Sequence, residues 1–106
     1  MQSLSDTKVK QKYLDPTMFG NLVWDYKMLP QEFFDILENK RVLGNFNQDW
    51  AIGRVLEHTN YYDAMGLVSL PTLHARWSSV ESRIFNKELA HGYNYLLQRQ
   101  ALSATR

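Results

Sequence analysis

The sequence contains no cysteine, and this absence removes several kinds of chemistry at once. Disulfide bridges, thiolate metal sites and cysteine nucleophiles are all excluded. A chain without cysteine also fits a reducing cytosol. No apolar run approaches the roughly 18 residues that a membrane span requires, and the first six residues lack the apolar core of a signal peptide. We therefore expect a cytoplasmic protein with no membrane partner.

The patterns of known catalytic and metal sites are also lacking. His58, His74 and His91 fall on three different segments, no two of them at i, i+4 spacing, and no carboxylate completes a ligand set. The five glycines are scattered, so there is no glycine-rich phosphate loop. No nucleophile stands beside an identifiable base. We predict a protein that is not an enzyme and holds neither metal nor cofactor; a site assembled between subunits is the remaining route to catalysis.

The chain carries little net charge, but its charge is unevenly distributed. The formal net charge is +1. Residues 30–68 contain three basic and six acidic residues, whereas residues 69–106 contain five basic and two acidic ones. This split either marks a nucleic-acid face or lets the two halves attract each other.

Aromatic residues are abundant for so small a chain. There are five Phe, three Trp and six Tyr among 106 residues. Each buried Tyr hydroxyl needs a hydrogen-bond partner. Some of the tyrosines are therefore expected at the surface, where they suit an interface with another chain, or else half-buried at the edge of the core.

The spacing of apolar residues predicts an all-α fold, a compact array of four or five short helices in a single domain over residues 15–106. Residues 1–14 are mostly polar, and we expect a disordered, flexible tail there. Asp15 and Pro16 are typical of a helix start. The segment after Pro16 is either a full helix or one turn that leads into a loop. The next helix is expected over residues 30–42, with a glycine shortly after it as the stop.

Further helices complete the prediction. Asn47 caps the next helix, and the pattern restarts for a short helix over residues 61–67. Another short helix is expected after Pro71. The last helix is expected to begin at a capping box formed by Ser78 and Glu81 and to run to about residue 100.

Residues 61–80 have the order of a helix-turn-helix element, in which two short helices are separated by a break and the second enters the major groove of DNA. On this interpretation Arg76, Arg83 and Lys87 are the DNA or partner contacts. A proline just after the break and the irregular spacing of small residues argue against it. The alternative is that Arg76 and Arg83 are surface charges that pair with the acidic half of the chain.

Three short stretches between residues 22 and 80 carry a resemblance. They are Leu22-Val23-Trp24-Asp25-Tyr26, Arg54-Val55-Leu56-Glu57, and Leu70-Pro71-Thr72 followed by Trp77. Together they resemble a small uncharacterised bacterial family with a Phe-Trp-Asp segment, an Arg-Val-Leu-Glu segment and a Thr-to-Trp stretch at comparable intervals. The chain departs from that pattern at Val23, where the family has an aromatic residue, and after Glu57, where no glycine follows.

Members of that family are often encoded beside nucleotidyltransferase-type toxins, so the resemblance implies an antitoxin or accessory regulator and no catalytic residues. With the composition, it favours a non-catalytic regulatory or binding module that docks on a protein partner and, in one version, on DNA. The competing hypothesis is a self-associating structural protein. That protein would be a homodimer formed through the C-terminal helix by Ile84, Leu89 and Leu96.

Overall fold

The computed structural model describes the backbone of residues 4–104 and the side chains of residues 8–99, and within that range the chain folds into helices without a β-strand. The helices are α1 (Leu4–Leu14), α2 (Pro16–Leu22), α3 (Pro30–Leu37), α4 (Gln48–His58), α5 (Tyr61–Leu67), α6 (Leu70–Glu81) and α7 (Lys87–Ala104). The prediction of an all-α fold is confirmed. The predicted number of four or five helices is too low.

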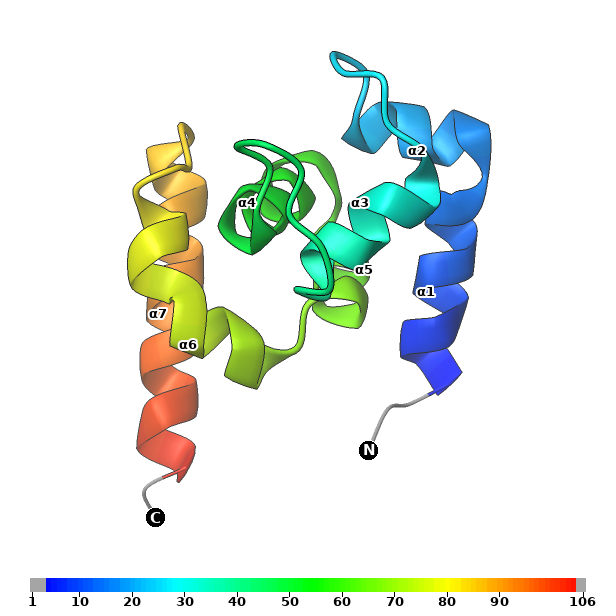
Figure 1. Cartoon of the computed structure of the whole chain (residues 1–106). Coiled ribbons are helices and arrows are strands. Elements are labelled where there is room, and N and C mark those ends of the chain that lie inside the picture. The colour runs from blue at the N-terminus through cyan, green and yellow to red at the C-terminus, as the bar shows by residue number, and fades with distance from the viewer. Residues whose placement is uncertain (1–3, 105–106) are drawn as a thin grey trace.

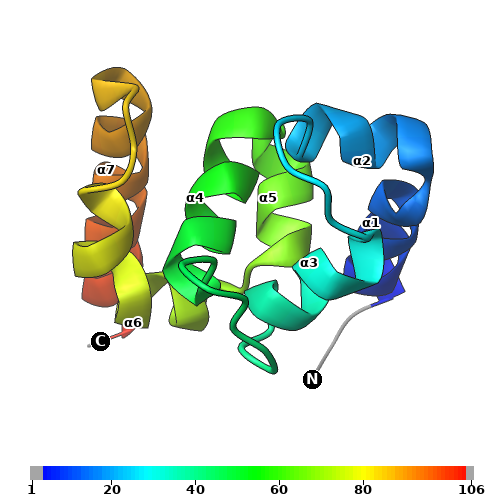
Figure 2. The same ribbon diagram turned by 45° about the horizontal axis from the view of Figure 1, so that its top comes forward.

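Two groups of helices flank a central pair (Figures 1 and 2). Helices α6 and α7 pack against each other at one edge of the molecule, and α1 lies at the opposite edge with α2 and α3 nearby. Helices α4 and α5 run side by side between these groups, and α4 contacts α2, α3 and α6. Helix α4 therefore joins the two sides of the molecule. No described helix combines the length and the apolar character needed to cross a bilayer.

The core forms where α3 meets α4. Phe33 and Phe34 of α3 are essentially inaccessible, as are Ile52 and Leu56 of α4. Close-packed side chains of this size contribute about 1.5–3 kcal/mol each on burial, so this contact anchors the fold. Trp50, also on α4, is half-buried, and its ring packs against that of Phe33.

Local capping signals place most helix starts where the sequence predicts them. The Asp15 carboxylate accepts hydrogen bonds from two backbone N–H groups of α2, and Asn47 and Asn60 cap α4 and α5 in the same way. These side chains satisfy donors that a helix start leaves without an intrahelical partner. Helix α2 ends at Leu22, so the segment after Pro16 is a short helix that leads into a loop.

Helix α3 is shorter than predicted. It ends at Leu37, not at residue 42. Asn39 adopts a φ of 62°, in the left-handed region that Asn tolerates better than most residues, and this turns the chain out of the helix. Gly44 has a φ of 59° and supports the next turn, as a glycine can.

The prediction of a disordered tail over residues 1–14 is wrong for the part that the structure describes. Residues 4–14 form α1, and α1 packs on α5. Val9 and Tyr13, four residues apart among the lysines, form an apolar stripe, and Tyr13 is buried. Because lysines stand on both sides of Val9 and directly before Tyr13, the sequence pattern there is mostly polar and does not indicate this stripe. Residues 1–3 lie outside the described range.

The boundary between the last two helices also differs from the prediction. Ser78 and Glu81 lie within α6 and do not cap the last helix. A turn follows α6, and the side chain of Asn86 accepts a hydrogen bond from the N–H of Leu89 at the start of α7. A Ser-x-x-Glu pattern inside a helix looks the same as a capping box in the sequence, and here the helix continues through it.

Candidate functional site

Arg54 is the centre of the most distinctive polar arrangement on the surface. It projects from the outer side of α4 toward the loop that follows α2. Its Nε and Nη2 donate to the carbonyl oxygen of Leu22 at 3.2 and 3.1 Å, and its Nη1 and Nη2 donate to the Asp25 carboxylate at 3.1 and 2.6 Å. The Arg54 side chain is only 13% exposed. A bidentate pair of this kind fixes both partners in orientation, so the loop is held firmly on α4.

Aromatic rings surround the Arg54 guanidinium. Its central carbon lies 4.5 Å from the ring centre of Trp24, 5.6 Å from that of Trp50 and 6.0 Å from that of Tyr26. Phe46 then packs against Tyr26 and Trp50 at 4.7 and 4.5 Å between ring centres. We call Trp24, Tyr26, Phe46 and Trp50 the aromatic surface.

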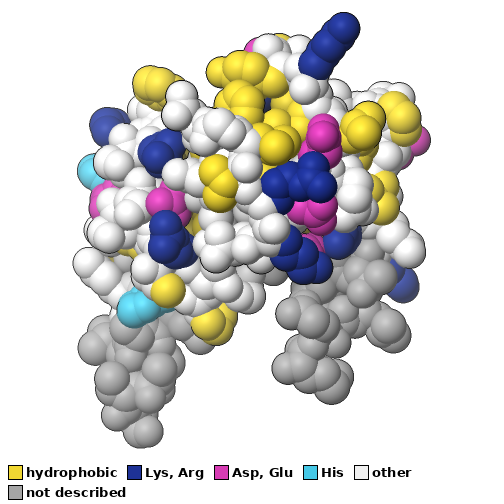
Figure 3. Space-filling model, viewed as in Figure 1, with side chains coloured by type: hydrophobic (Ala, Val, Ile, Leu, Met, Phe, Trp, Pro, Cys, Tyr) yellow, Lys and Arg dark blue, Asp and Glu magenta, His cyan; other side chains and the backbone are white. Residues whose placement is uncertain are grey.

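Two rings of the aromatic surface are open to solvent, and the other two, Phe46 and Trp50, are half-buried. Trp24 is 60% exposed and Tyr26 is 47% exposed. Figure 3 shows hydrophobic side chains gathered on this face over the α2–α3 and α3–α4 loops. Exposed apolar groups that gather in one patch mark sites where proteins bind other molecules. This patch is the candidate functional site.

His58 extends the same face toward the end of α4. Its ring meets that of Trp24 edge to face, with the ring centres 4.7 Å apart. Burial lowers the pKa of His58, and the nearby Arg54 charge lowers it further, against the opposing effect of Glu57 and Asp25. The hydrogen bonds from Arg54 lower the pKa of Asp25. Asp25 therefore keeps its charge to a lower pH than an ordinary aspartate does, while burial favours the neutral form of His58.

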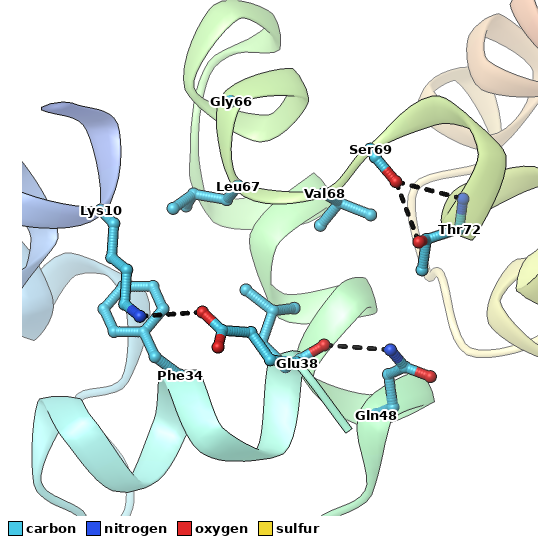
Figure 4. A pocket seen from close by; sticks show the side chains of 10 residues that line it. Lys10, Phe34, Glu38, Gln48, Gly66, Leu67, Val68, Ser69 and Thr72 are labelled. Carbon is cyan, nitrogen blue, oxygen red and sulfur yellow. Dashed lines mark hydrogen bonds and ion pairs between the residues drawn. The ribbon is translucent and has the colours of Figure 1, made fainter. Parts of the chain in front are cut away.

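A cleft on another part of the molecule is lined by residues of α1, α3 and the α5–α6 region (Figure 4). Its volume is about 450 Å³. The Lys10 ammonium lies 2.9 Å from a Glu38 carboxylate oxygen, and Gln48 donates to the carbonyl oxygen of Leu37 at 3.1 Å. Ser69 and Thr72 bond each other. These polar side chains around the cleft are thus hydrogen-bonded to their neighbours.

A second cavity of about 300 Å³ lies between α6 and α7. Trp77 and Asn94 line it and bond each other at 3.3 Å. Within the described part of the chain, no three His, Asp or Glu side chains come together as metal ligands. The three histidines lie on α4, α6 and α7.

The residues predicted as DNA or partner contacts lie on α6, in the turn after it and at the start of α7. Arg76 forms a bidentate pair with Asp49, with both bonds at 2.8 Å, so it does contact the acidic half of the chain. Arg83 approaches α4 where Gly53 leaves room beside the helix. Lys87 begins α7 and is exposed. Among the residues whose side chains are described, Arg83 and Lys87 form no ion pair.

The predicted two helices of the helix-turn-helix element exist as α5 and α6, and Val68 and Ser69 join them. The arginine expected on the recognition helix, Arg76, already binds Asp49. The three residues proposed for a C-terminal homodimer are not fully exposed to a second chain. Ile84 precedes α7 and is buried, and Leu89 and Leu96 pack partly against the core.

The tyrosines divide between the two expected environments. Tyr13 and Tyr93 are buried, and burial raises the pKa of Tyr93 to about 12. The exposed tyrosines are Tyr26, Tyr61, Tyr62 and Tyr95. Of these, Tyr26 belongs to the aromatic surface. The sequence patterns did not single out the aromatic surface as a site; the signal available was an aromatic-rich stretch, Trp24 to Tyr26, placed between a helix end and Pro30.

Two of the stretches that carry the family resemblance meet in the structure. Asp25 belongs to the first stretch and Arg54 to the second, and they form the ion pair described above. Trp77 from the third stretch is buried in α6. No family model matches this sequence, and neither does any curated protein or solved structure.

Proposed function

We propose that this protein is a non-catalytic binding module that docks on a protein partner through the aromatic surface. The observation that carries the proposal is the exposure of Trp24 and Tyr26 on a loop that Arg54 holds in place. Trp, Tyr and Arg are the residues most often responsible for binding energy at protein interfaces.

Rigidity makes this exposure useful for binding. A flexible loop loses conformational freedom when a partner orders it, and each ordered side chain costs about 0.5–1.5 kcal/mol. Here the bonds from Arg54 to Leu22 and Asp25 already fix the loop. The rings are presented to the partner without that loss, which favours a specific interface over chance exposure of apolar groups.

The partner that the resemblance suggests is a nucleotidyltransferase-type toxin encoded beside this gene. In that case the module acts in the cytoplasm as an antitoxin or accessory regulator. An apolar face whose central arginine is paired with a carboxylate suits a protein surface of low charge at the point of contact. The partner's identity follows from the resemblance alone, and the aromatic surface is what the experiment tests.

The test is binding to the product of the adjacent gene, measured by co-purification and by titration calorimetry. Trp24→Ala is expected to weaken binding by at least about tenfold, as hot-spot residues do. Tyr95→Ala is the matched control, because Tyr95 is 61% exposed and Trp24 is 60% exposed, but Tyr95 lies on α7. Circular dichroism and thermal unfolding verify that both variants fold.

Failure of the wild-type protein to bind any adjacent gene product would overturn the proposal, as would equal losses for the two variants. Self-association is read from light scattering of the protein alone. A homodimer that Trp24→Ala dissociates would assign the aromatic surface to a second copy of the chain instead.

A further inference from the structure

Phe85, in the turn between α6 and α7, is the most exposed of the large apolar side chains described. Its exposed fraction is 90%. The backbone around it is nevertheless fixed. The Phe85 N–H donates to the Glu57 carboxylate at 2.9 Å, and the preceding residue, Ile84, is buried. On the other side Asn86 caps α7.

The Phe85 ring is exposed on a turn whose backbone is already ordered, which favours binding to an apolar pocket. Moving a Phe side chain out of water is favourable, and in this chain the Phe85 ring remains in water. Because the Glu57 contact already orders the turn, a partner that buries the ring does not also have to order the backbone. Phe85 therefore has the properties of a preformed anchor for an apolar pocket.

Arg83 and Lys87 flank Phe85, two residues before and two residues after it, and Arg76 lies further back on α6. We call Arg76, Arg83 and Lys87 the basic rim. The Arg76 side chain is 45% exposed although it pairs with Asp49, and Arg83 and Lys87 are exposed and form no ion pair within the described part of the chain.

Most carboxylates of this region are buried or already accept hydrogen bonds from the protein. Asp49 is buried, and Glu57 accepts hydrogen bonds from the backbone of the turn. Glu81 is half-buried. Glu88 is exposed on α7, but it is not within ion-pair distance of the basic rim. The exposed charged side chains of this region are therefore the three of the basic rim and Glu88, so basic groups outnumber acidic ones among them.

Phe85 and the basic rim lie next to the aromatic surface along α4. Asp49, Gly53 and Glu57 follow each other at four-residue steps and face Arg76, Arg83 and the turn. The adjacent row of α4 carries Trp50, Arg54 and His58. Trp50 is itself part of the aromatic surface, and the other two side chains pack on Trp24. Figure 3 shows basic side chains over the α6–α7 side of the same face on which the hydrophobic patch lies.

We infer that Phe85 inserts into an apolar pocket on the partner protein and that the basic rim pairs with carboxylates around that pocket. This inference rests on the proposed function, since it describes a second part of the same interface. The aromatic surface would meet a region of low charge, and the turn would meet an acidic one. Charge complementarity of this kind sets orientation and the rate of association more than affinity.

A protein fits this surface better than a nucleic acid. Arg76 is neutralised by Asp49, so the excess of positive charge facing solvent comes from two side chains. Nucleic-acid binding draws its affinity from many phosphate contacts and falls steeply with salt. A ring as exposed as that of Phe85 gains most from an apolar pocket, which a phosphate backbone does not offer.

The experiment measures association and dissociation rates with the adjacent gene product at low and high salt. Phe85→Ala is expected to raise the Kd by at least about tenfold, mainly through faster dissociation. The double variant R83E/K87E is expected to slow association about tenfold at low salt and to abolish its salt dependence. Neither Arg83 nor Lys87 has an ion-pair partner to lose within the described residues, which makes them safer targets than Arg76.

Arg99→Glu is the matched control for charge reversal, because Arg99 is exposed toward the other end of α7. It should leave both rates within about twofold of wild type. A short single-stranded DNA and its duplex are titrated in parallel. Binding to either with a steep salt slope that R83E/K87E removes would assign the basic rim to nucleic acid and overturn the inference.

The outcome separates the inference from the proposed function. If Trp24→Ala weakens binding while Phe85→Ala and R83E/K87E do not, the proposed function stands and the inference is wrong. If the wild-type protein does not bind the adjacent gene product, both are wrong. Loss of binding with Trp24→Ala, Phe85→Ala and R83E/K87E, but not with Arg99→Glu, supports both.

Discussion

Two ionic networks hold distant segments of this protein against its helices, but they differ in whether the aromatic ring beside them is buried. On α5, the Asp63 carboxylate accepts hydrogen bonds from the Tyr13 hydroxyl at 2.6 Å and from Lys12 at 2.8 Å, and both Asp63 and Tyr13 are buried. On α4, Arg54 binds Asp25 and Leu22, yet Trp24 beside it stays largely in water.

The difference indicates what each network contributes. The Asp63 network secures α1 against α5 and buries an aromatic ring, so packing and stability account for it. The Arg54 network holds apolar rings in solvent, which stability alone does not explain. If this comparison is right, damage to the Asp63 network lowers stability and leaves binding nearly intact, whereas damage to the Arg54 network affects binding more than stability.

Asp63→Ala should have the largest effect on stability. The Tyr13 hydroxyl would remain in the core without its acceptor, and a buried polar group left unpaired costs about 1–3 kcal/mol. Lys12 adds little, because its side chain is 44% exposed. We expect the free energy of unfolding to fall by about 2–3 kcal/mol in urea titrations. Tyr13→Phe should lose about 1 kcal/mol, since it removes one bond and strands no buried hydroxyl.

Burial by itself would raise the pKa of Asp63, but the hydrogen bonds from Lys12 and Tyr13 outweigh it and lower that pKa. The stabilising effect of this carboxylate is therefore present at neutral pH and is lost as the pH falls below the ordinary carboxyl range. A loss below about 1 kcal/mol for Asp63→Ala at pH 7 would contradict the role assigned to this network.

Gly66→Ala tests the same contact by steric means. A Cβ at this position would stand 2.7 Å from a methyl carbon of Val9 on α1, so α1 would have to shift. We expect a loss of about 1–2 kcal/mol, within the range of overpacked sites. Gly92→Ala is the matched control, because Gly92 lies inside α7 with nothing near its Cβ position, and it should gain about 0.5–1 kcal/mol from helix propensity. Equal effects of the two changes would show that α1 does not pack closely on α5.

Local signals in the sequence predicted much of the helical framework. Asp15 and Asn47 cap helices as expected, because a cap involves only residues two or three positions away. Asn60 caps α5, where the sequence indicated only that the pattern restarts. The same locality explains the errors. Ser78 and Glu81 satisfy the pattern of a cap without forming one, and the apolar pair Val9 and Tyr13 is interrupted by lysines.

The candidate site was harder to predict because it depends on long-range contacts. Asp25 and Arg54 are 29 residues apart, and nothing in the sequence shows that a loop after α2 lies along α4. The abundance of tyrosine correctly suggested exposed aromatic residues but could not place them. The sequence predicts Arg76, Arg83 and Lys87 as contacts because they are basic residues on or after the expected recognition helix. The structure places Arg76 and Arg83 against α4 and Lys87 at the start of α7.

Arg54→Met should separate stability from binding most clearly. The change removes four hydrogen bonds to Leu22 and Asp25 and a cation that stacks on Trp24. Asp25 stays hydrated at the surface, so we expect a stability loss of only about 1–2 kcal/mol. Backbone amides of residues 23–26 should exchange hydrogen faster, and affinity for the partner should fall more than it does for Asp63→Ala. The comparison fails if Asp63→Ala reduces affinity more.

The smallest effect should come from the titration of His58. Burial and the charge of Arg54 lower its pKa in the folded protein, so the unfolded chain binds a proton at His58 more readily. Stability should therefore be unaffected well above pH 6.5, the ordinary value, and should decline as the pH falls below it. His58→Gln should flatten this decline in urea titrations between pH 7.5 and 5.5, which extend about one pH unit on either side of the ordinary histidine pKa. His91→Gln, at an exposed site on α7, is the control and should keep the wild-type slope.

Because His58 packs on Trp24, the same acidification should also loosen the aromatic surface. Partner binding by the wild-type protein should therefore weaken as the pH falls, and binding by His58→Gln should weaken less.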